Sequence, residues 1–300
     1  MTMKIGFIGL GIMGKPMCKN LLKAGYDIKI SSRNSETNKE LNELGAEVVS
    51  SLKQLAEISD TIITMLPNSP EVLDVILGKE GIINWVRRGT TIIDMSSISP
   101  IVSKEIYSVL IKKDIDFLDA PVSGGEPKAI DGTLSVMVGG KEEIFHKCLP
   151  ILETMTSSVV RMGKVGSGNA TKLVNQIIVA LNIAAVSEAF VLAQSMKIDT
   201  ELVYRAIRGG LAGSAVLDSK APMIMNRDFR AGFKINLHLK DLNNVMDTSE
   251  NLNTPLPLTS SIREILKSLV IDGDGYEDHA AIVKYFEKVA STEVNPKLVK

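Results

Sequence analysis

Three glycines near the start, Gly9, Gly11 and Gly14, constrain the fold of this chain more than any other feature of its sequence. They follow a short apolar run at 4–8 and precede a segment of helical periodicity that ends at Gly25. In such a strand–turn–helix context the first glycine permits a tight turn, the second lets backbone approach a pyrophosphate, and the third lets helix and strand pack closely. The helix N-terminus adds N–H donors and the positive end of a dipole. The spacing therefore predicts a dinucleotide-binding βαβ unit, with a glycine turn that binds nothing as the alternative.

The end of the second expected strand, at 26–31, bears on which dinucleotide binds. NAD sites usually place Asp or Glu about 20 residues beyond the glycines, where the carboxylate holds the ribose 2′-hydroxyl. This chain has Ser31, Ser32 and Arg33 there, with no acid. An arginine pairs well with a 2′-phosphate and a serine hydroxyl can hydrogen-bond it, so the pattern favours NADPH. The alternative is a solvated surface arginine.

Strand and helix patterns alternate through the first half of the chain, up to residue 164. Such alternation predicts an α/β fold with a doubly wound, Rossmann-like sheet over 1–164. Further strands are expected at 46–50, 61–67, 90–96, 115–123 and 133–140. Ligands bind beyond the carboxyl ends of the strands in these folds. The loops that should wall a cofactor and substrate crevice there are 65–69, 94–97 and 119–127.

The stretch VSGGEP, in the last of these loops, is suited to a carboxylate. Ser123 offers a hydroxyl, and Gly124 and Gly125 leave backbone N–H groups uncovered. We therefore expect these three residues to bind an acidic substrate. The alternative is a plain glycine turn between strands.

Residues 165–300 show helical periodicity and few strand signals. They predict an all-helical domain for substrate binding and oligomerisation, with helices at 171–196, 200–207, 239–252, 258–268 and 279–290. The first of these is apolar on most sides, which is typical of a helix buried in a domain or between subunits. Asn182, Ser187 and Glu188 interrupt its apolar surface, so we do not expect it to span a membrane.

The head of that helix carries Lys172, Asn175 and Gln176 on one face, together with Gly168 and Val179. A lysine near a helix N-terminus opposes the dipole, and capping would prefer an acid there. Function often lies where a residue contradicts local preference. An unfavourable electrostatic setting lowers the pKa of a lysine, which suits an acid/base at neutral pH. The alternative is a lysine that extends to solvent and has no role.

Composition argues against several classes of function. The 300 residues carry a net charge of −1 without a long charged run, so nucleic acid and anionic membranes are not expected partners. Cys18 and Cys148 do not indicate a disulfide framework, which fits a reducing cytoplasm. His146 and His238 lack metal-ligand spacing, so no metal is expected. Asp278 is expected to cap the last helix rather than to take part in catalysis.

Four motifs in order resemble those of the β-hydroxyacid dehydrogenase family: GFIGLGIMG at 6–14, DAPVSGG at 119–125, GSGNATKLVNQ at 166–176 and KDL at 240–242. The resemblance covers essentially the whole chain. It implies that Lys172 is the catalytic acid/base, that Asn175 binds substrate and that Ser123, Gly124 and Gly125 hold the substrate carboxylate. The positions that we expect to contact the cofactor are Gly9, Gly11, Ile12, Met13, Gly14, Ser32, Arg33, Leu66, Pro67, Ser97, Phe233 and Lys240.

The resemblance also implies an oxidoreductase that uses NAD(P)H. Relatives often have Asn or Asp where this chain has Ser32, but Arg33 is kept, which favours NADPH. The expected reaction is reduction of tartronate semialdehyde (2-hydroxy-3-oxopropanoate) to glycerate, with 3-hydroxyisobutyrate or another β-hydroxyacid as the alternative substrate. Family members form dimers and tetramers, so a cytoplasmic homodimer or homotetramer is expected. A non-enzymatic nucleotide-binding scaffold is a rival from another class, and Lys172 argues against an imine reductase.

Overall fold

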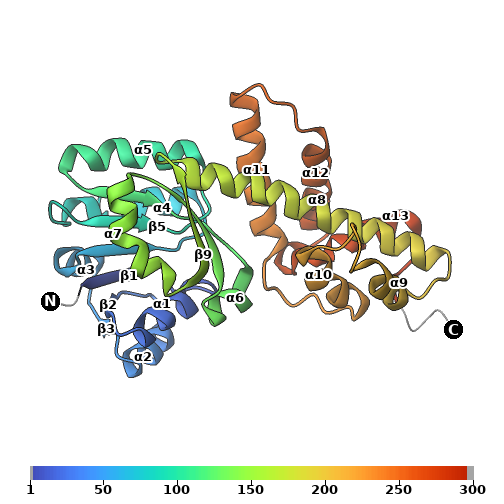
Figure 1. Ribbon diagram of the computed structural model, residues 1–300, viewed down its shortest axis with the longest axis horizontal. Coiled ribbons are helices and arrows are strands. Elements are labelled where there is room, and N and C mark those ends of the chain that lie inside the picture. Colours follow the sequence, from blue (N-terminus) through green and yellow to red (C-terminus); the bar gives the residue numbers. More distant parts are fainter. Residues whose placement is uncertain (1–2, 296–300) are drawn as a thin grey trace. The chain divides into compact units, whose positions relative to one another are not determined.

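The computed structural model describes residues 3–295 (Figure 1). Its contacts divide the chain into two compact units, residues 1–172 and 173–300. The division falls inside the long helix α8 (Ser167–Ser195), so the first turns of that helix belong to the first unit.

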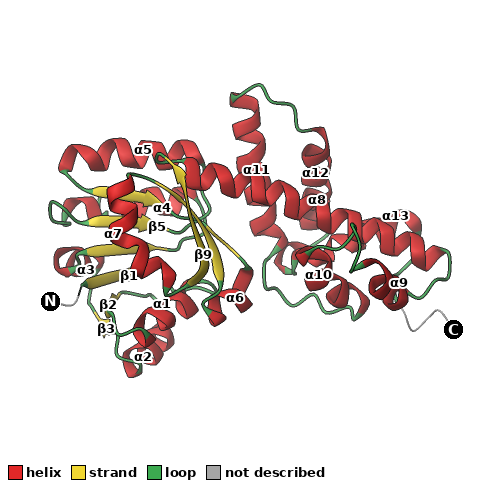
Figure 2. Ribbon diagram, in the orientation of Figure 1, coloured by secondary structure: helices red, strands yellow, loops and turns green. Residues whose placement is uncertain are grey.

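The first unit is built on one sheet, whose described strands follow the order β3-β2-β1-β4-β5-β6-β8-β7, with β9 also paired to β8 (Figure 2). The strands from β3 to β6 are parallel, whereas β8 runs antiparallel to β6 and β7. The chain changes direction across the sheet between β1 and β4, and ligands bind beyond the carboxyl ends of strands at such a point. The strand bounds are β1 Lys4–Ile8, β2 Asp27–Ile30, β3 Glu47–Val48, β4 Thr61–Thr64, β5 Thr91–Asp94, β6 Asp116–Asp119, β7 Val122–Ser123, β8 Leu134–Gly139 and β9 Thr156–Gly163.

Helices cover both faces of this sheet. One buried cluster joins the strands to α1, α2, α6 and α7, and a second cluster joins them to α3, α4 and α5. Two cores of this kind explain why the central strands are apolar without alternation, as in β4, where all four residues are buried. The helix bounds are α1 Gly14–Lys23, α2 Ser35–Glu43, α3 Leu52–Ile58, α4 Ser69–Leu77, α5 Pro100–Leu110, α6 Gly125–Asp131 and α7 Glu142–Glu153, with short 3-10 turns at Ile82–Asn84 and Ile111–Lys113.

Each strand expected from the sequence contains an observed strand, and the doubly wound fold is confirmed. The expected strand at 115–123 is divided in two, because Pro121 separates β6 from β7. The sequence reasoning missed β9, which pairs in parallel with β8 over Leu134–Gly139. Most residues of β9 are exposed or half-buried, so the strand lacks the apolar run that announces a buried strand.

The second unit is helical. Its core joins α8 to α11 and α12, and a smaller cluster joins the end of α8 to α10 and α13. Four of the expected helices are observed: α9 has the expected bounds, and the other three have shifted ends. The last expected helix is instead a 3-10 turn, His279–Ile282, followed by α13. Helix α10 was missed, since Pro222 lies inside it. The bounds are α9 Thr200–Ile207, α10 Ala215–Met225, α11 Ile235–Asn251, α12 Pro257–Ile271 and α13 Val283–Ala290, with a further 3-10 turn at Asp274–Tyr276.

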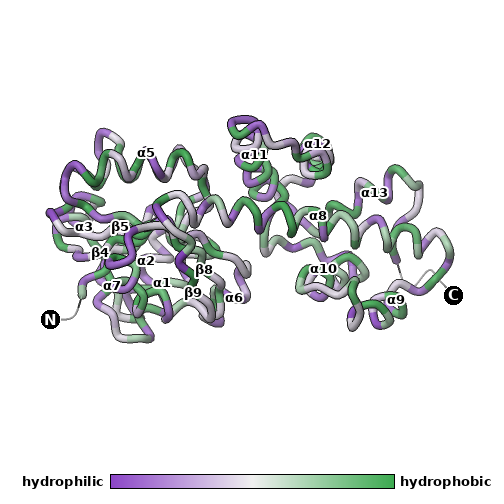
Figure 3. Tube along the Cα trace, turned by 45° about the horizontal axis from the view of Figure 1, so that its top comes forward, coloured by the Kyte–Doolittle hydropathy of each residue, from purple (hydrophilic) through white to green (hydrophobic). Residues whose placement is uncertain are grey.

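Helix α8 is the one described helix long and apolar enough to cross a membrane by length and composition. Its packing is that of a core helix, because Ala180, Ile183 and Phe190 are buried in the clusters of the second unit. The Ser187 hydroxyl is also fully buried and donates to the carbonyl of Ile183. Figure 3 shows hydrophilic positions among the apolar ones along α8, as the sequence predicts. We therefore treat α8 as part of a protein core.

Candidate active site

The glycine turn after β1 has the geometry that a dinucleotide needs. Gly9 has a φ of +97°, a left-handed conformation that favours glycine. A Cβ at Gly14 would lie 1.9 Å from the carbonyl oxygen of Gly9, so only glycine lets the helix approach this closely. A Cβ at Gly11 would meet nothing within 4 Å, which leaves that backbone open to a ligand. The three glycines thus occupy the three settings that their spacing predicts.

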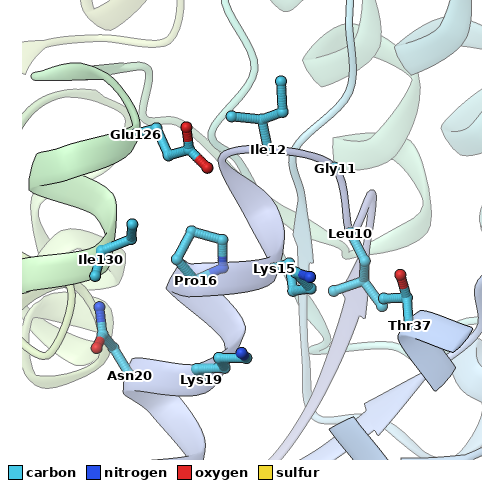
Figure 4. A pocket seen from close by; sticks show the side chains of 10 residues that line it. All are labelled: Leu10, Gly11, Ile12, Lys15, Pro16, Lys19, Asn20, Thr37, Glu126 and Ile130. Carbon is cyan, nitrogen blue, oxygen red and sulfur yellow. The ribbon is translucent and has the colours of Figure 1, made fainter. Parts of the chain in front are cut away.

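A hollow of about 450 Å³ lies beside this turn, along α1 (Figure 4). Gly11 and Ile12 stand at one end, and Lys19 and Asn20 stand at the other. The remaining lining residues are Leu10, Lys15, Pro16, Thr37, Glu126 and Ile130. Neither Lys172 nor Ser123 lines this hollow, so it lies next to the glycine turn without containing the expected reaction centre.

The end of β2 holds its polar residues in a turn. The Ser32 hydroxyl accepts a hydrogen bond from the backbone N–H of Asn34 at 3.1 Å, and Asn38 donates to the Ser32 carbonyl at 2.8 Å. Asn34 in turn caps α2 by accepting from the N–H of Thr37. The Arg33 side chain is exposed at the carboxyl end of the sheet. This position suits a 2′-phosphate and equally suits a solvated arginine, so the cofactor preference stays a prediction.

The loops after β4 and β5 are tied to each other. The backbone N–H of Leu66 donates to the Ser96 hydroxyl at 2.8 Å. Asp94, at the end of β5, accepts from the Thr64 hydroxyl at 2.8 Å and from the N–H of Ser96 at 3.2 Å. Burial raises the pKa of the Asp94 carboxyl from 3.8 to about 6. The loops that carry Leu66, Pro67 and Ser97 are therefore held by a buried network, which the sequence reasoning did not foresee.

The Ser123-Gly124-Gly125 stretch forms a turn in which both glycines have a positive φ. Ser123 ends β7, and Gly124 and Gly125 have φ values of +140° and +70°. A Cβ at Gly125 would come no closer than 3.8 Å to the Pro127 side chain, so the backbone there is uncovered, whereas a Cβ at Gly124 would lie 2.7 Å from the Lys128 side chain. The turn begins four residues after Asp119, the last residue of β6.

The same residue, Asp119, holds the start of α8. Its carboxylate oxygens accept from the backbone N–H groups of Gly166 at 2.7 Å and of Asn169 at 2.8 Å. The Asn169 side chain accepts from the N–H of Ile98 at 3.0 Å and donates to the Ser103 hydroxyl at 3.1 Å. These bonds attach the first turn of α8 to the ends of β5 and β6. Sequence reasoning missed Asp119 and Asn169, although both lie inside the motifs that it singled out.

Lys172 follows one turn later on α8 and is only 7% exposed. A lysine that extends to solvent is therefore excluded, and the alternative that gives it no role loses its main support. Taken within the first unit, the glycine turn, the Ser-Gly-Gly turn and the start of α8 are all positioned by the carboxyl end of one sheet. This arrangement can bind a dinucleotide and an acidic compound and can provide a buried amine.

The second unit contains a separate buried network. Gln176 donates to Asp241 at 2.5 Å and accepts from the Asn175 side chain at 2.8 Å. The ammonium group of Lys240 lies 2.8 Å from the other carboxylate oxygen of Asp241. Gln176 and Asp241 are buried, so they restrain the orientation of Asn175 and Lys240. Nothing in the sequence marked Asp241 as the link between these two candidates.

Phe233 and Asp278 lie together in the second unit. The Phe233 ring packs edge-on against the rings of His238 and His279, and its backbone N–H donates to Asp278. Asp278 also accepts from the N–H of Ala280, which confirms the predicted cap. Among residues 3–295, no three His, Cys, Asp or Glu side chains are grouped as a metal site requires.

The two cysteines are free and buried. Burial raises the pKa of the Cys18 thiol to about 12 and that of the Cys148 thiol to about 11. Because the thiolate is the reactive form, neither side chain is suited to nucleophilic chemistry at neutral pH.

Known proteins are similar to this chain over most of its length. Residues 4–163 match the NAD binding domain of 6-phosphogluconate dehydrogenase, and residues 166–286 match the NAD-binding model of NADP-dependent 3-hydroxyisobutyrate dehydrogenase. The 2-hydroxy-3-oxopropionate reductase of Escherichia coli (strain K12) is 42% identical over 96% of this chain and 99% of its own length. The 2-(hydroxymethyl)glutarate dehydrogenase of Eubacterium barkeri is 36% identical over 98% of both chains. A crystal structure of 3-hydroxyisobutyrate dehydrogenase from Salmonella typhimurium has a TM-score of 0.86 at 29% identity, over 94% of this chain and 99% of that one.

Proposed function

Because the chain belongs to the β-hydroxyacid dehydrogenase family of NAD(P)-dependent oxidoreductases, we propose that it is a 2-hydroxy-3-oxopropionate reductase that converts tartronate semialdehyde into glycerate. The main support for the reaction type is that Lys172 is buried. It lies one turn into a helix whose start is hydrogen-bonded to the end of the sheet. The identity of 42% with a reductase of that name supports the choice of substrate.

In the proposed reaction, the bound reduced nicotinamide supplies a hydride to the aldehyde carbon. Lys172, as ammonium, donates a proton to the carbonyl oxygen, so the aldehyde gains one hydride and one proton and becomes the alcohol. Ser123 and the backbone N–H groups at Gly124 and Gly125 hold the substrate carboxylate. Asn175 holds a second substrate oxygen. In the reverse direction the neutral Lys172 amine accepts the proton from the alcohol.

The cofactor that we propose is NADPH. Its pyrophosphate would lie against the backbone at Gly11, which is open because no other atom lies within 4 Å of a Cβ placed there. Arg33 would pair with the 2′-phosphate, because it is exposed at the end of β2 and has no acidic residue beside it. Leu66, Pro67, Ser97, Phe233 and Lys240 are proposed as further cofactor contacts. The family model that matches residues 166–286 is described as that of an NADP-dependent enzyme, which agrees with this preference.

The second candidate substrate is 3-hydroxyisobutyrate. Two comparisons favour it: the family model that matches residues 166–286 and the solved relative are both named for 3-hydroxyisobutyrate dehydrogenase. The test compares oxidation of glycerate with oxidation of 3-hydroxyisobutyrate, each with NADP+ and with NAD+, by the absorbance of the reduced nicotinamide. A higher kcat/KM for glycerate supports the proposal, and a higher value for 3-hydroxyisobutyrate replaces it. Binding of nucleotide without turnover of any β-hydroxyacid would favour a scaffold protein instead.

We also propose that the enzyme is a cytoplasmic homodimer or homotetramer. In the second unit, Val174, Ile178 and Leu192 lie on one face of α8 and are 56%, 57% and 62% exposed. Exposed apolar side chains at both ends of one helix face are expected to pack against a partner. Sedimentation of the wild type and of Leu192→Glu tests this: the wild type should be oligomeric, and the variant should dissociate.

A further inference from the structure

We propose that Asp119 is a positioning residue for catalysis, because its carboxylate caps α8 from the sheet and so places Lys172 relative to the substrate turn. The inference rests on the proposed role of Lys172 as the acid/base. Every residue in the argument, from Asp94 to Lys172, belongs to the first unit.

The place of Asp119 is determined by its strand and by two glycines. It ends β6, opposite Asp94 of β5 and Gly139 of β8, and it is fully buried. A Cβ at Gly139 would lie 2.2 Å from the Asp119 carboxylate, and a Cβ at Gly168 would lie 2.4 Å from the Asp119 carbonyl oxygen. Only glycine at both positions lets β8 and α8 pack this closely around the acid.

The carboxylate acts as a helix cap supplied from a distant part of the chain. Its two oxygens bind the N–H groups of Gly166, just before α8, and of Asn169, the third residue of the helix. A cap is normally the residue that precedes the helix, whereas this one lies 47 residues before Gly166. Two bonds from one rigid group restrain both the position of the helix end and its rotation about its axis.

This restraint is passed on to Lys172 by the helix itself. Lys172 follows Asn169 by three residues, about 4.5 Å along the axis, on the same side of α8. The Ser123-Gly124-Gly125 turn starts four residues after Asp119. Asp119 is therefore linked to the substrate turn along the chain and to the helix that carries Lys172 by its two hydrogen bonds. Burial raises the pKa of its carboxyl to about 6, while the N–H groups of Asn169 and Gly166 lower it, because both donors favour the ionised form.

The variant that tests this is Asp119→Asn, which keeps the shape but turns one acceptor oxygen into an NH₂ group that cannot accept from the helix. We expect kcat to fall by about 10²-fold, the loss typical of a displacement of about 1 Å at the reacting atoms. The Kd for NADPH, measured by nucleotide fluorescence, should stay within about twofold, because the glycine turn is untouched. The matched control is Asp116→Asn at the other end of β6, which loses an ion pair with Lys141 and should keep wild-type kcat.

A double-mutant cycle with Lys172→Ala separates positioning from a general loss of structure. If Asp119 acts through Lys172, Asp119→Asn should reduce the residual rate of Lys172→Ala far less than it reduces that of the wild type. An equal reduction in both backgrounds would overturn the inference and leave the role of Lys172 intact. Full turnover by Lys172→Ala would overturn the proposed function itself.

A second variant tests the same inference if Asp119→Asn does not fold. Asn169→Ala removes the other attachment of the helix start, to Ile98 and Ser103, and leaves the cap in place. We expect a lower melting temperature, because the Ile98 N–H and the Ser103 hydroxyl lose a buried partner, together with a lower kcat and an unchanged Kd for NADPH in the folded protein. Wild-type kcat in a folded Asn169→Ala variant would contradict the idea that the placement of the helix start controls Lys172.

Discussion

Two alanine substitutions in the glycine turn should separate folding from cofactor binding. In Gly14→Ala the new Cβ would lie 1.9 Å from the carbonyl oxygen of Gly9 and 3.2 Å from the Phe7 ring. The oxygen belongs to the backbone of a turn that already has a φ of +97°, so it cannot move freely. Relief to an ordinary contact of about 3.4 Å requires a displacement of roughly 1.5 Å between α1 and the turn, and overpacking of this kind costs about 1–3 kcal/mol.

The cost for Gly14→Ala should appear as a lower melting temperature. In a unit of this size, about 1 kcal/mol corresponds to roughly 2–4 °C, so we expect a decrease of about 2–12 °C. NADPH binding should be lost as well, since the turn that holds the pyrophosphate is displaced. The assay is thermal unfolding without cofactor, followed by fluorescence titration with NADPH.

The matched control is Gly11→Ala, in the same turn. Nothing lies within 4 Å of its new Cβ, and its φ is not in the left-handed region, so the melting temperature should be unchanged or slightly higher. Affinity for NADPH should nevertheless fall, because the methyl group covers the backbone that the pyrophosphate approaches. An unchanged melting temperature in Gly14→Ala would refute the packing argument, and wild-type affinity in Gly11→Ala would refute the proposed placement of the cofactor.

Four further outcomes are expected. Lys172→Ala should lower turnover by about 10²–10⁴-fold with little change in NADPH affinity; wild-type turnover would exclude it as the acid/base. Arg33→Ala should weaken NADPH more than NADH, by about 1.5–3 kcal/mol, as titration of both cofactors would reveal. Gly124→Val should raise the KM for substrate and spare the cofactor, because valine resists a φ of +140° and its Cβ would lie 2.7 Å from the Lys128 side chain, so the turn is displaced; an unchanged KM in a folded variant would place the carboxylate elsewhere. The pKa of Asp94 is about 6 when folded and 3.8 when unfolded, so the folded state binds the proton more tightly between these values and stability falls as pH rises through them. The free energy of unfolding in urea should be measured for the wild type and for Asp94→Asn at about pH 5 and pH 7. Relative to the variant, the wild type should be more stable at pH 5 than at pH 7 by roughly 1 kcal/mol.

Local patterns in the sequence were sufficient for the α/β unit and for most helices. The glycine spacing determines the first turn because φ values near +97° and contacts near 1.9 Å exclude other residues. Apolar runs identify the central strands because helices cover both faces of the sheet. The same rule failed for β9, whose residues are mostly exposed or half-buried, and the rule for helices failed for α10, which contains Pro222.

The candidate site depended more on tertiary structure. The sequence by itself singled out Lys172, Asn175 and Ser123 as candidate site residues, since they lie in motifs whose chemistry is local, and their roles stay predictions. Whether Lys172 extends to solvent or is buried was open from the sequence, because both rotamers suit a helix start. The tertiary structure buries it, on a helix whose start is attached to the sheet by hydrogen bonds between residues 47 to 71 positions apart, Asp119 with Gly166 and Asn169 with Ile98. No periodicity encodes a contact over such a separation, because the chain brings these groups together only when the sheet and the helix have packed.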